Sequence, residues 1–178
     1  MSFSPLKVSL LTGVVSSSYF FFGNLGAASF GIVPAIRDEG GVDLSVAQKV
    51  ALQTWHYKVA KVHMGSSGAI STLSFALAAY LSHSRGMRTI LLSAAALSLT
   101  LLTPWTLLLM QPINNELDEL AHTRALKVSP GAERSPDHSL LEKRAMEKID
   151  IWRKLHMGRI VLGAGVWIGG LAALSYVV

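Results

Sequence analysis

The composition of this 178-residue chain is that of a membrane protein and not of a soluble or disordered one. Hydrophobic residues make up 51% of the chain and charged residues 15%, where about a quarter is usual in soluble domains. The net charge of +5 does not come from a dense run of Lys and Arg, which argues against nucleic acid as a partner. The chain has no cysteine, so disulfides, thiolate metal sites and cysteine nucleophiles are excluded.

Four apolar stretches are each long enough for a helix that crosses a bilayer, which takes about 20 residues. They lie at about 8–36, 64–82, 89–113 and 157–178. The first is too long for a secretory signal, and we expect it to be a retained helix. The predicted fold is therefore all-α: an integral membrane four-helix bundle that forms a single domain over residues 1–178.

A long polar region, residues 114–156, separates the third stretch from the fourth. Ser129-Pro130-Gly131 and Ser135-Pro136 indicate a loop, which we expect to be flanked by helical ends. Beyond Pro136 the charges alternate in sign at spacings that suit pairs four residues apart. This pattern predicts a helix that runs directly into the fourth span.

The basic residues are unevenly divided between the two sides of the predicted bundle. One side carries Lys7, Arg85 and Arg88, and the other carries the remaining 13 of the 16 Lys and Arg residues. The positive-inside rule then places both long loops in the cytosol, with the lipid bilayer as the main partner of the chain.

Small residues and one proline mark places where helices pack closely or bend. Gly165-x-x-x-Gly169 and Ala27-x-x-x-Gly31 are typical of close helix packing, and the former pair could also join two copies in a homodimer. Pro104 lies inside the third span. Because proline leaves a backbone carbonyl without its partner one turn earlier, we expect a kink there.

Polar and aromatic residues gather at one membrane face, although polar groups in a bundle need partners or a function. They are Gln53, Trp55, His56 and His63 from the second helix, Trp105, Gln111, Asn114 and Asn115 from the third, and Trp152, His156 and Arg159 from the fourth. The last three follow i, i+4, i+7 spacing, so they share one stripe of a helix. The stripe either faces a cavity inside the bundle or forms an anchor at the lipid headgroups.

The histidines permit a metal site but do not favour one. His56 and His63 lie on one helix face about 10 Å apart along the axis, too far for one ion to bind both directly. A copper, iron or zinc site built from His56 or His63, His156 and Glu116 is an alternative, but the usual close-spaced ligand motifs are missing. We expect the other histidines, His83, His122 and His138, to face solvent.

Two short motifs resemble a known family. The third span ends in Pro104-Trp105-Thr106, Met110 and the run from Pro112 to Leu117, and the fourth opens with Trp152-x-x-x-His156-x-x-Arg159. With four spans and a polar loop before the last, the chain resembles the anthrone oxygenases, small membrane proteins of aromatic polyketide pathways and secondary metabolite biosynthesis.

The resemblance implies a monooxygenase that oxidises a flat, apolar anthrone to an anthraquinone with molecular oxygen as co-substrate. In this interpretation His156 is the general base, Arg159 and Asn114 stabilise the resulting anion, and Trp152 packs against the rings. Further substrate-binding candidates are Trp105, Asn115, Gln53 and His56. We expect no cofactor, with copper or iron as the alternative, and a location in an internal membrane such as the endoplasmic reticulum.

Three other functions compete with this interpretation. A scaffold or assembly factor would use the glycine faces and the polar loop for contacts with other proteins. A metal-dependent oxidoreductase would act on another substrate. A transporter is less well supported, because we find no inverted repeat and no charge inside a span on which alternating access could be built.

Overall fold

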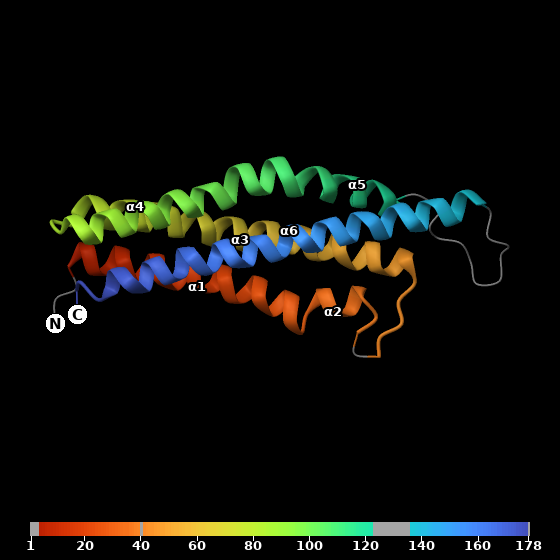
Figure 1. The fold of residues 1–178 in the computed structure, drawn as a ribbon, viewed down its shortest axis with the longest axis horizontal. Helices are drawn as coiled ribbons and strands as arrows, with labels where there is room; N and C mark the ends of the chain where they lie inside the picture. Colours follow the sequence, from red (N-terminus) through yellow and green to blue (C-terminus); the bar gives the residue numbers. More distant parts are fainter. Residues whose placement is uncertain (1–3, 40, 123–135, 178) are drawn as a thin grey trace.

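A computed structural model describes residues 4–39, 41–122 and 136–177 of the chain. Four long helical segments run side by side, and the two ends of the chain lie at the same end of the bundle (Figure 1). All four are long and apolar enough to cross a membrane. The predicted all-α four-helix architecture is confirmed, whereas the predicted loop around Ser129-Pro130-Gly131 falls outside the described residues.

The helices are bounded by the capping residues that the sequence supplies. In chain order they are α1 (Pro5–Ser29), α2 (Ile32–Ile36), α3 (Val46–Leu81), α4 (Arg85–Thr100), the π-helix η1 (Leu101–Met110), α5 (Gln111–His122) and α6 (Pro136–Leu174). The side chains of Ser4, Ser45 and Ser84 each accept a hydrogen bond from a backbone N–H of the first turn of α1, α3 and α4. Such caps satisfy donors that have no partner within the helix.

The first apolar stretch forms two helices and not the single predicted one. α1 ends at Ser29, and α2 begins at Ile32 after a turn at Phe30 and Gly31. A Cβ on Gly31 would lie 2.9 Å from the Cα of Ala27, so the turn needs glycine at this position. The Ala27-x-x-x-Gly31 pattern therefore serves a turn within the chain and not a packing face between helices, which corrects our interpretation.

Around Pro104, where the sequence predicts a kink, the chain forms a ten-residue π-helix, η1, between α4 and α5. The hydroxyl of Thr106 donates a hydrogen bond of 2.7 Å to the Leu101 carbonyl, five residues earlier. A π-helical turn is wider than an α-helical turn and is often found at functional sites. In this chain η1 supplies Thr106 and Met110 to the cavity described below.

The bundle is longer than a bilayer is thick. α3 has 36 residues and α6 has 39, or about 54 and 58 Å at 1.5 Å per residue, against about 30 Å for the hydrocarbon core. Two apolar cores follow one another along the axis, one around Phe75 and Leu91 and the other around Ile36 and Leu117. The second core lies at the end where α2 and α5 cover α3 and α6 (Figure 1).

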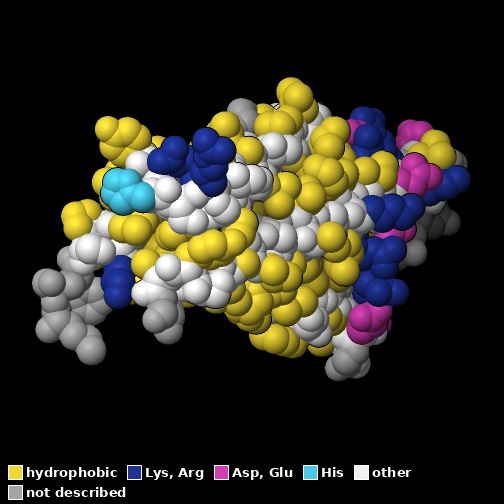
Figure 2. Space-filling model, turned by 60° about the vertical axis from the view of Figure 1, so that its left-hand side comes forward, with side chains coloured by type: hydrophobic (Ala, Val, Ile, Leu, Met, Phe, Trp, Pro, Cys, Tyr) yellow, Lys and Arg dark blue, Asp and Glu magenta, His cyan; other side chains and the backbone are white. Residues whose placement is uncertain are grey.

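The outer surface carries an apolar belt between charged ends. Apolar side chains cover the middle of the face in Figure 2, and acidic side chains gather with Lys and Arg at one end. On α3 the exposed apolar residues begin at Trp55 and continue through Val59 and Val62. Large exposed apolar side chains therefore start nine residues before Met64, the predicted start of the second span, and they are interspersed there with the exposed Lys58 and Lys61.

The glycines of α6 face another helix of the same chain. A Cβ on Gly165 would lie 3.1 Å from the Leu97 side chain, and one on Gly169 would lie 3.3 Å from Ala94. Both contacts are to α4, so close packing within the bundle accounts for the glycine pattern. A homodimer through this face stays a prediction.

Candidate functional site

A polar cavity lies where the two apolar cores meet. Its lining residues come from all four long segments: Asn24, His56, Tyr57, Ala60, Thr106, Met110, Asn114, Trp152, His156 and Arg159. Its volume is about 20 Å³, room for about one water-sized molecule. The structure thus brings together five of the predicted site residues, and the Trp152, His156 and Arg159 stripe faces the interior of the bundle.

His156 is held by a backbone carbonyl of a different helix. The residue is 2% exposed, and its Nε2 lies 3.1 Å from the carbonyl oxygen of Asn24 in α1. Because a carbonyl can only accept, Nε2 must carry the proton. A neutral imidazole held in this way has its lone pair on Nδ1, which makes no hydrogen bond to the described residues and is free to take a proton.

Trp152 supports the imidazole from one side. Its ring stacks on that of His156, with centroids 5.0 Å apart and planes at 15°, and meets the His56 ring edge-on at 6.2 Å. Trp152 is 2% exposed. The predicted role of Trp152 as an open wall for a flat substrate is thus limited, since His156 already covers one face of its ring.

Arg159 brings a positive charge to the cavity that no carboxylate of the described residues neutralises. Its guanidinium carbon lies 4.8 Å from the centre of the Phe20 ring, and its Nε is buried without a hydrogen-bond partner among those residues. A buried charge is costly unless it is paired. An anionic ligand in the cavity would provide the missing partner.

Asn114 supplies an amide to the same cavity. Its Oδ1 accepts a hydrogen bond of 2.9 Å from Nε2 of Gln53 in α3. Asn114 is 2% exposed and Gln53 is fully buried. Of these two residues, Asn114 lines the cavity and Gln53 does not, so Gln53 contacts Asn114 and not the cavity.

Ion pairs fix the helix ends around this site. Glu116 of α5 accepts hydrogen bonds from Nε of Arg144 and Nζ of Lys148 in α6, both at 2.7 Å. Lys58 of α3 pairs with Asp118 of α5 at 2.9 Å. These contacts tie α5 to both neighbours one turn beyond Asn114.

Several predicted site residues lie away from the cavity. Nε1 of Trp105 donates to the Leu155 carbonyl at 3.3 Å, which joins η1 to α6. Asn115 is exposed on α5. Neither residue lines the cavity, and Gln53 reaches it through Asn114.

The histidines named for a metal site do not converge. His63 is exposed, with its Nδ1 3.5 Å from the Tyr19 hydroxyl, whereas His56 and His156 line the cavity. Within residues 4–39, 41–122 and 136–177, no group of three His, Asp or Glu side chains is close enough to hold one ion. His83 and His122 are exposed as expected, but His138 is buried, with Nδ1 3.7 Å from Glu142 of the next turn.

Sequence reasoning missed Asn24, Tyr57 and Thr106, which also line the cavity. Asn24 lies in the middle of an uncharged apolar stretch, and an amide in such a position needs a partner. Its Nδ2 donates to the Phe20 carbonyl at 2.6 Å. The position of Asn24 within an apolar stretch is visible in the sequence, and it is a reason to include α1 in the predicted site.

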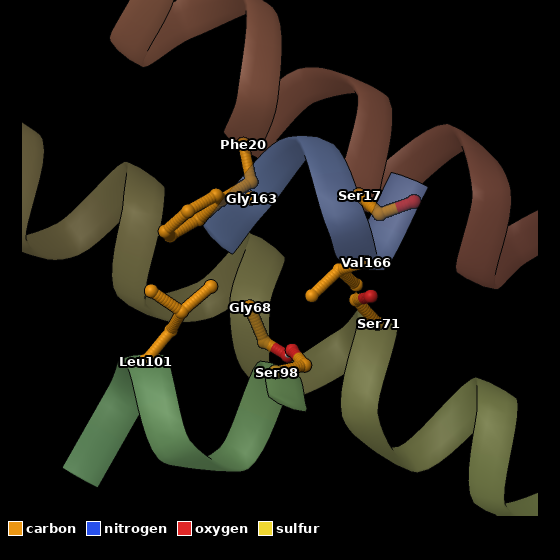
Figure 3. Close-up of a pocket in the computed structure, with 8 residues that line it drawn as sticks. All are labelled: Ser17, Phe20, Gly68, Ser71, Ser98, Leu101, Gly163 and Val166. Carbon is orange, nitrogen blue, oxygen red and sulfur yellow. The ribbon is translucent and has the colours of Figure 1, made fainter. Parts of the chain in front are cut away.

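A second, smaller cavity lies deeper in the bundle, enclosed by side chains from α1, α3, α6 and the α4–η1 segment (Figure 3). Its polar groups are the hydroxyls of Ser17, Ser71 and Ser98. None of its lining residues is ionisable at neutral pH, so it supplies no acid or base. Phe20 lines this cavity, and its ring contacts Arg159, which lines the polar cavity.

The fold and the cavity together define a multi-pass membrane protein whose helical bundle contains a buried histidine and an arginine that no carboxylate of the described residues neutralises. Residues 55–169 match the anthrone oxygenase family, and the chain belongs to this family. The match includes every cavity residue except Asn24. Comparisons with curated proteins and with solved structures gave no match.

Proposed function

We propose that the protein oxidises a flat, apolar anthrone of a polyketide pathway to an anthraquinone with molecular oxygen, using His156 as the general base. The observation that carries this proposal is the half-buried Arg159, whose Nε is buried, which has no carboxylate partner among the described residues and which shares a cavity with His156. A site of this kind binds an anion and holds a base beside it. Family membership supports an oxygenase.

The first step is removal of a proton from the central CH2 of the anthrone. Nδ1 of His156 takes the proton, and the electron pair spreads through the ring system to the carbonyl oxygen opposite. Arg159 and Nδ2 of Asn114 are the donors for the negative charge on that oxygen. Neutral Asn114 and cationic Arg159 act together, because both line the cavity.

The electron-rich anion then reacts with molecular oxygen. It gives one electron to oxygen, and the two radicals combine to form a bond between the former CH2 carbon and oxygen. The peroxide anion takes the proton back from His156 and becomes a hydroperoxide. The hydroperoxide then loses water, which includes the remaining hydrogen of the former CH2 carbon, and this carbon becomes a carbonyl. The overall reaction is anthrone plus O2 to anthraquinone plus water, in which oxygen accepts four electrons.

The cavity volume determines how each reactant binds. A cavity of about 20 Å³ holds a molecule of the size of oxygen or water but not three fused rings. The lining side chains of Tyr57, Met110 and Arg159 have to move apart for the larger substrate. An apolar substrate dissolved in the bilayer can approach from the exposed surface around Trp55 and Val59.

Turnover of emodin anthrone by the purified protein in detergent, under 18O2, tests this proposal. We expect quinone formation faster than the spontaneous rate, with one labelled oxygen in the quinone, in metal-free and metal-loaded samples alike. Activity that chelators abolish and a stoichiometric metal restores would favour the metal-dependent alternative. No acceleration in any sample would contradict the proposed reaction. In this proposal the protein is a multi-pass component of an internal membrane, with its long loops in the cytosol.

A further inference from the structure

The amide of Asn114 could face the cavity with either of its two ends. The oxygen and nitrogen of an amide are similar in size, so packing alone does not choose between them. Arg159 lines the same cavity, and its positive charge favours the amide oxygen toward it. In that orientation Oδ1 of Asn114, which is an acceptor, would lie beside the oxygen of an anionic substrate, which is also an acceptor, and no donor would face that oxygen.

A contact from outside the cavity opposes this preference. Nε2 of Gln53 donates to Oδ1 of Asn114 at 2.9 Å, and both residues are buried. The bond holds Oδ1 against Gln53, a residue of α3 that does not line the cavity. Nδ2 makes no hydrogen bond to the described residues and is left to donate to a ligand.

We propose that Gln53 is a positioning residue, whose hydrogen bond to Oδ1 turns the Asn114 amide so that Nδ2 donates to an anionic oxygen in the cavity. Gln53 contacts neither substrate nor cavity, and it acts through Asn114. This inference rests on the proposed function, because the role of Asn114 assumes an anionic intermediate. It assigns to Gln53 a different role from the direct substrate contact expected from the sequence.

The test compares variants of nearly equal shape in the full-length protein. Gln53→Met removes the donor, and Asn114→Leu removes the amide. Thr54→Val is the matched control, because Thr54 is the next residue of α3, is also buried, and has an Oγ1 without a hydrogen-bond partner among the described residues. Two readouts are measured: kcat and KM for emodin anthrone, and the ionisation midpoint of bound 2-hydroxyanthraquinone, whose phenolate has a distinct absorbance.

We expect Gln53→Met to lower kcat about tenfold with little change in KM, because a hydrogen bond to developing charge is lost. The ionisation midpoint of the bound probe should rise by about one pH unit. In the Asn114→Leu background Gln53→Met should have no further effect on either quantity. Thr54→Val should match the wild type.

A second variant keeps the inference testable if Gln53→Met does not fold. In Gln53→Glu a protonated carboxyl donates to Oδ1 as Gln53 does, whereas a carboxylate accepts from Nδ2 and turns the amide round. The kcat of this variant, relative to wild type at the same pH, should therefore fall as the pH rises. A ratio that does not change with pH contradicts the inference.

Arg159→Gln separates failure of this inference from failure of the proposed function. If Arg159→Gln raises the ionisation midpoint of the probe but Gln53→Met and Asn114→Leu do not, the role of Gln53 is overturned and the anion site remains. If none of the three variants moves the midpoint, the anion site itself is wrong, and the inference is overturned with it.

Discussion

His156 of α6 and Asn24 of α1 are joined by a hydrogen bond of 3.1 Å from Nε2 to a backbone carbonyl, which fixes the tautomer of the imidazole. We therefore expect His156 to carry its proton on Nε2 and none on Nδ1 at neutral pH. Nitrogen NMR of 15N-histidine-labelled protein, compared with His156→Ala to assign the signals, measures this. A protonated Nδ1 with a bare Nε2 would show that the lone pair does not face the cavity.

Arg159 should control the affinity for anionic ligands. Arg159→Gln is expected to weaken binding of the 2-hydroxyanthraquinone phenolate by about 10- to 100-fold, the cost of a lost charged hydrogen bond, and Arg159→Lys should retain part of the affinity. Arg153→Gln is the matched control, since Arg153 lies on the same helix and contacts Asp150 at 3.4 Å. Equal affinities for Arg159→Gln and Arg153→Gln would remove Arg159 from the site.

Two serines of the deeper cavity should respond oppositely to the loss of their hydroxyls. Ser98 donates to the Gly68 carbonyl and accepts from Thr72, so Ser98→Ala should lower stability by about 1 kcal/mol. Ser71 Oγ is buried without a partner among the described residues, so Ser71→Ala should be neutral or stabilising. Thermal unfolding in detergent measures both. A loss of stability in Ser71→Ala that is larger than the loss in Ser98→Ala would indicate that the Ser71 hydroxyl makes a hydrogen bond that the structure does not contain.

The turn before α3 should lose stability in acid. A hydrogen bond from Lys49 holds the pKa of the Asp38 carboxyl below its usual value of 3.8, so the ionised form is favoured in the folded state. The stabilisation that the ionised Asp38 gives to the folded state is complete above pH 3.8. It disappears as the pH falls through the lower pKa that Asp38 has in the folded state.

The thermal midpoints of wild type and Asp38→Asn should therefore differ by a constant amount above about pH 5 and converge below about pH 4. Glu39→Gln is the control, because Glu39 pairs with Arg37 between two exposed side chains and such pairs contribute little. A difference that persists unchanged in acid would mean that the charge of Asp38 is not what stabilises the turn.

Much of the fold follows from the sequence because each span is long, apolar and bounded by charges. The extension of the fourth span into a helix from Pro136 follows from helix rules and is confirmed, and the departure from α-helical geometry around Pro104 is a π-helix. The break at Gly31 was missed because an uncharged stretch gives no signal of a turn when its residues are apolar on both sides.

The site could be predicted in part. Helix periodicity placed His156 and Arg159 on one stripe, and span positions placed Asn114 at the same depth. The side of a neighbouring helix that faces the stripe depends on how that helix is rotated about its axis. A helix that is apolar on all sides gives no sequence signal of this rotation. For this reason Asn24 was missed, and Trp105, Asn115 and Gln53 were assigned to a cavity that they do not line.

The most direct test of the account is the rate of emodin anthrone oxidation by purified wild type, His156→Ala and His63→Ala, at equal protein concentration. His156 is buried beside Arg159, and His63 is exposed on α3. We predict that His156→Ala loses about 10²- to 10⁴-fold, as expected for a general base, and that His63→Ala retains the wild-type rate. Full activity of His156→Ala would contradict the central claim that His156 takes the proton.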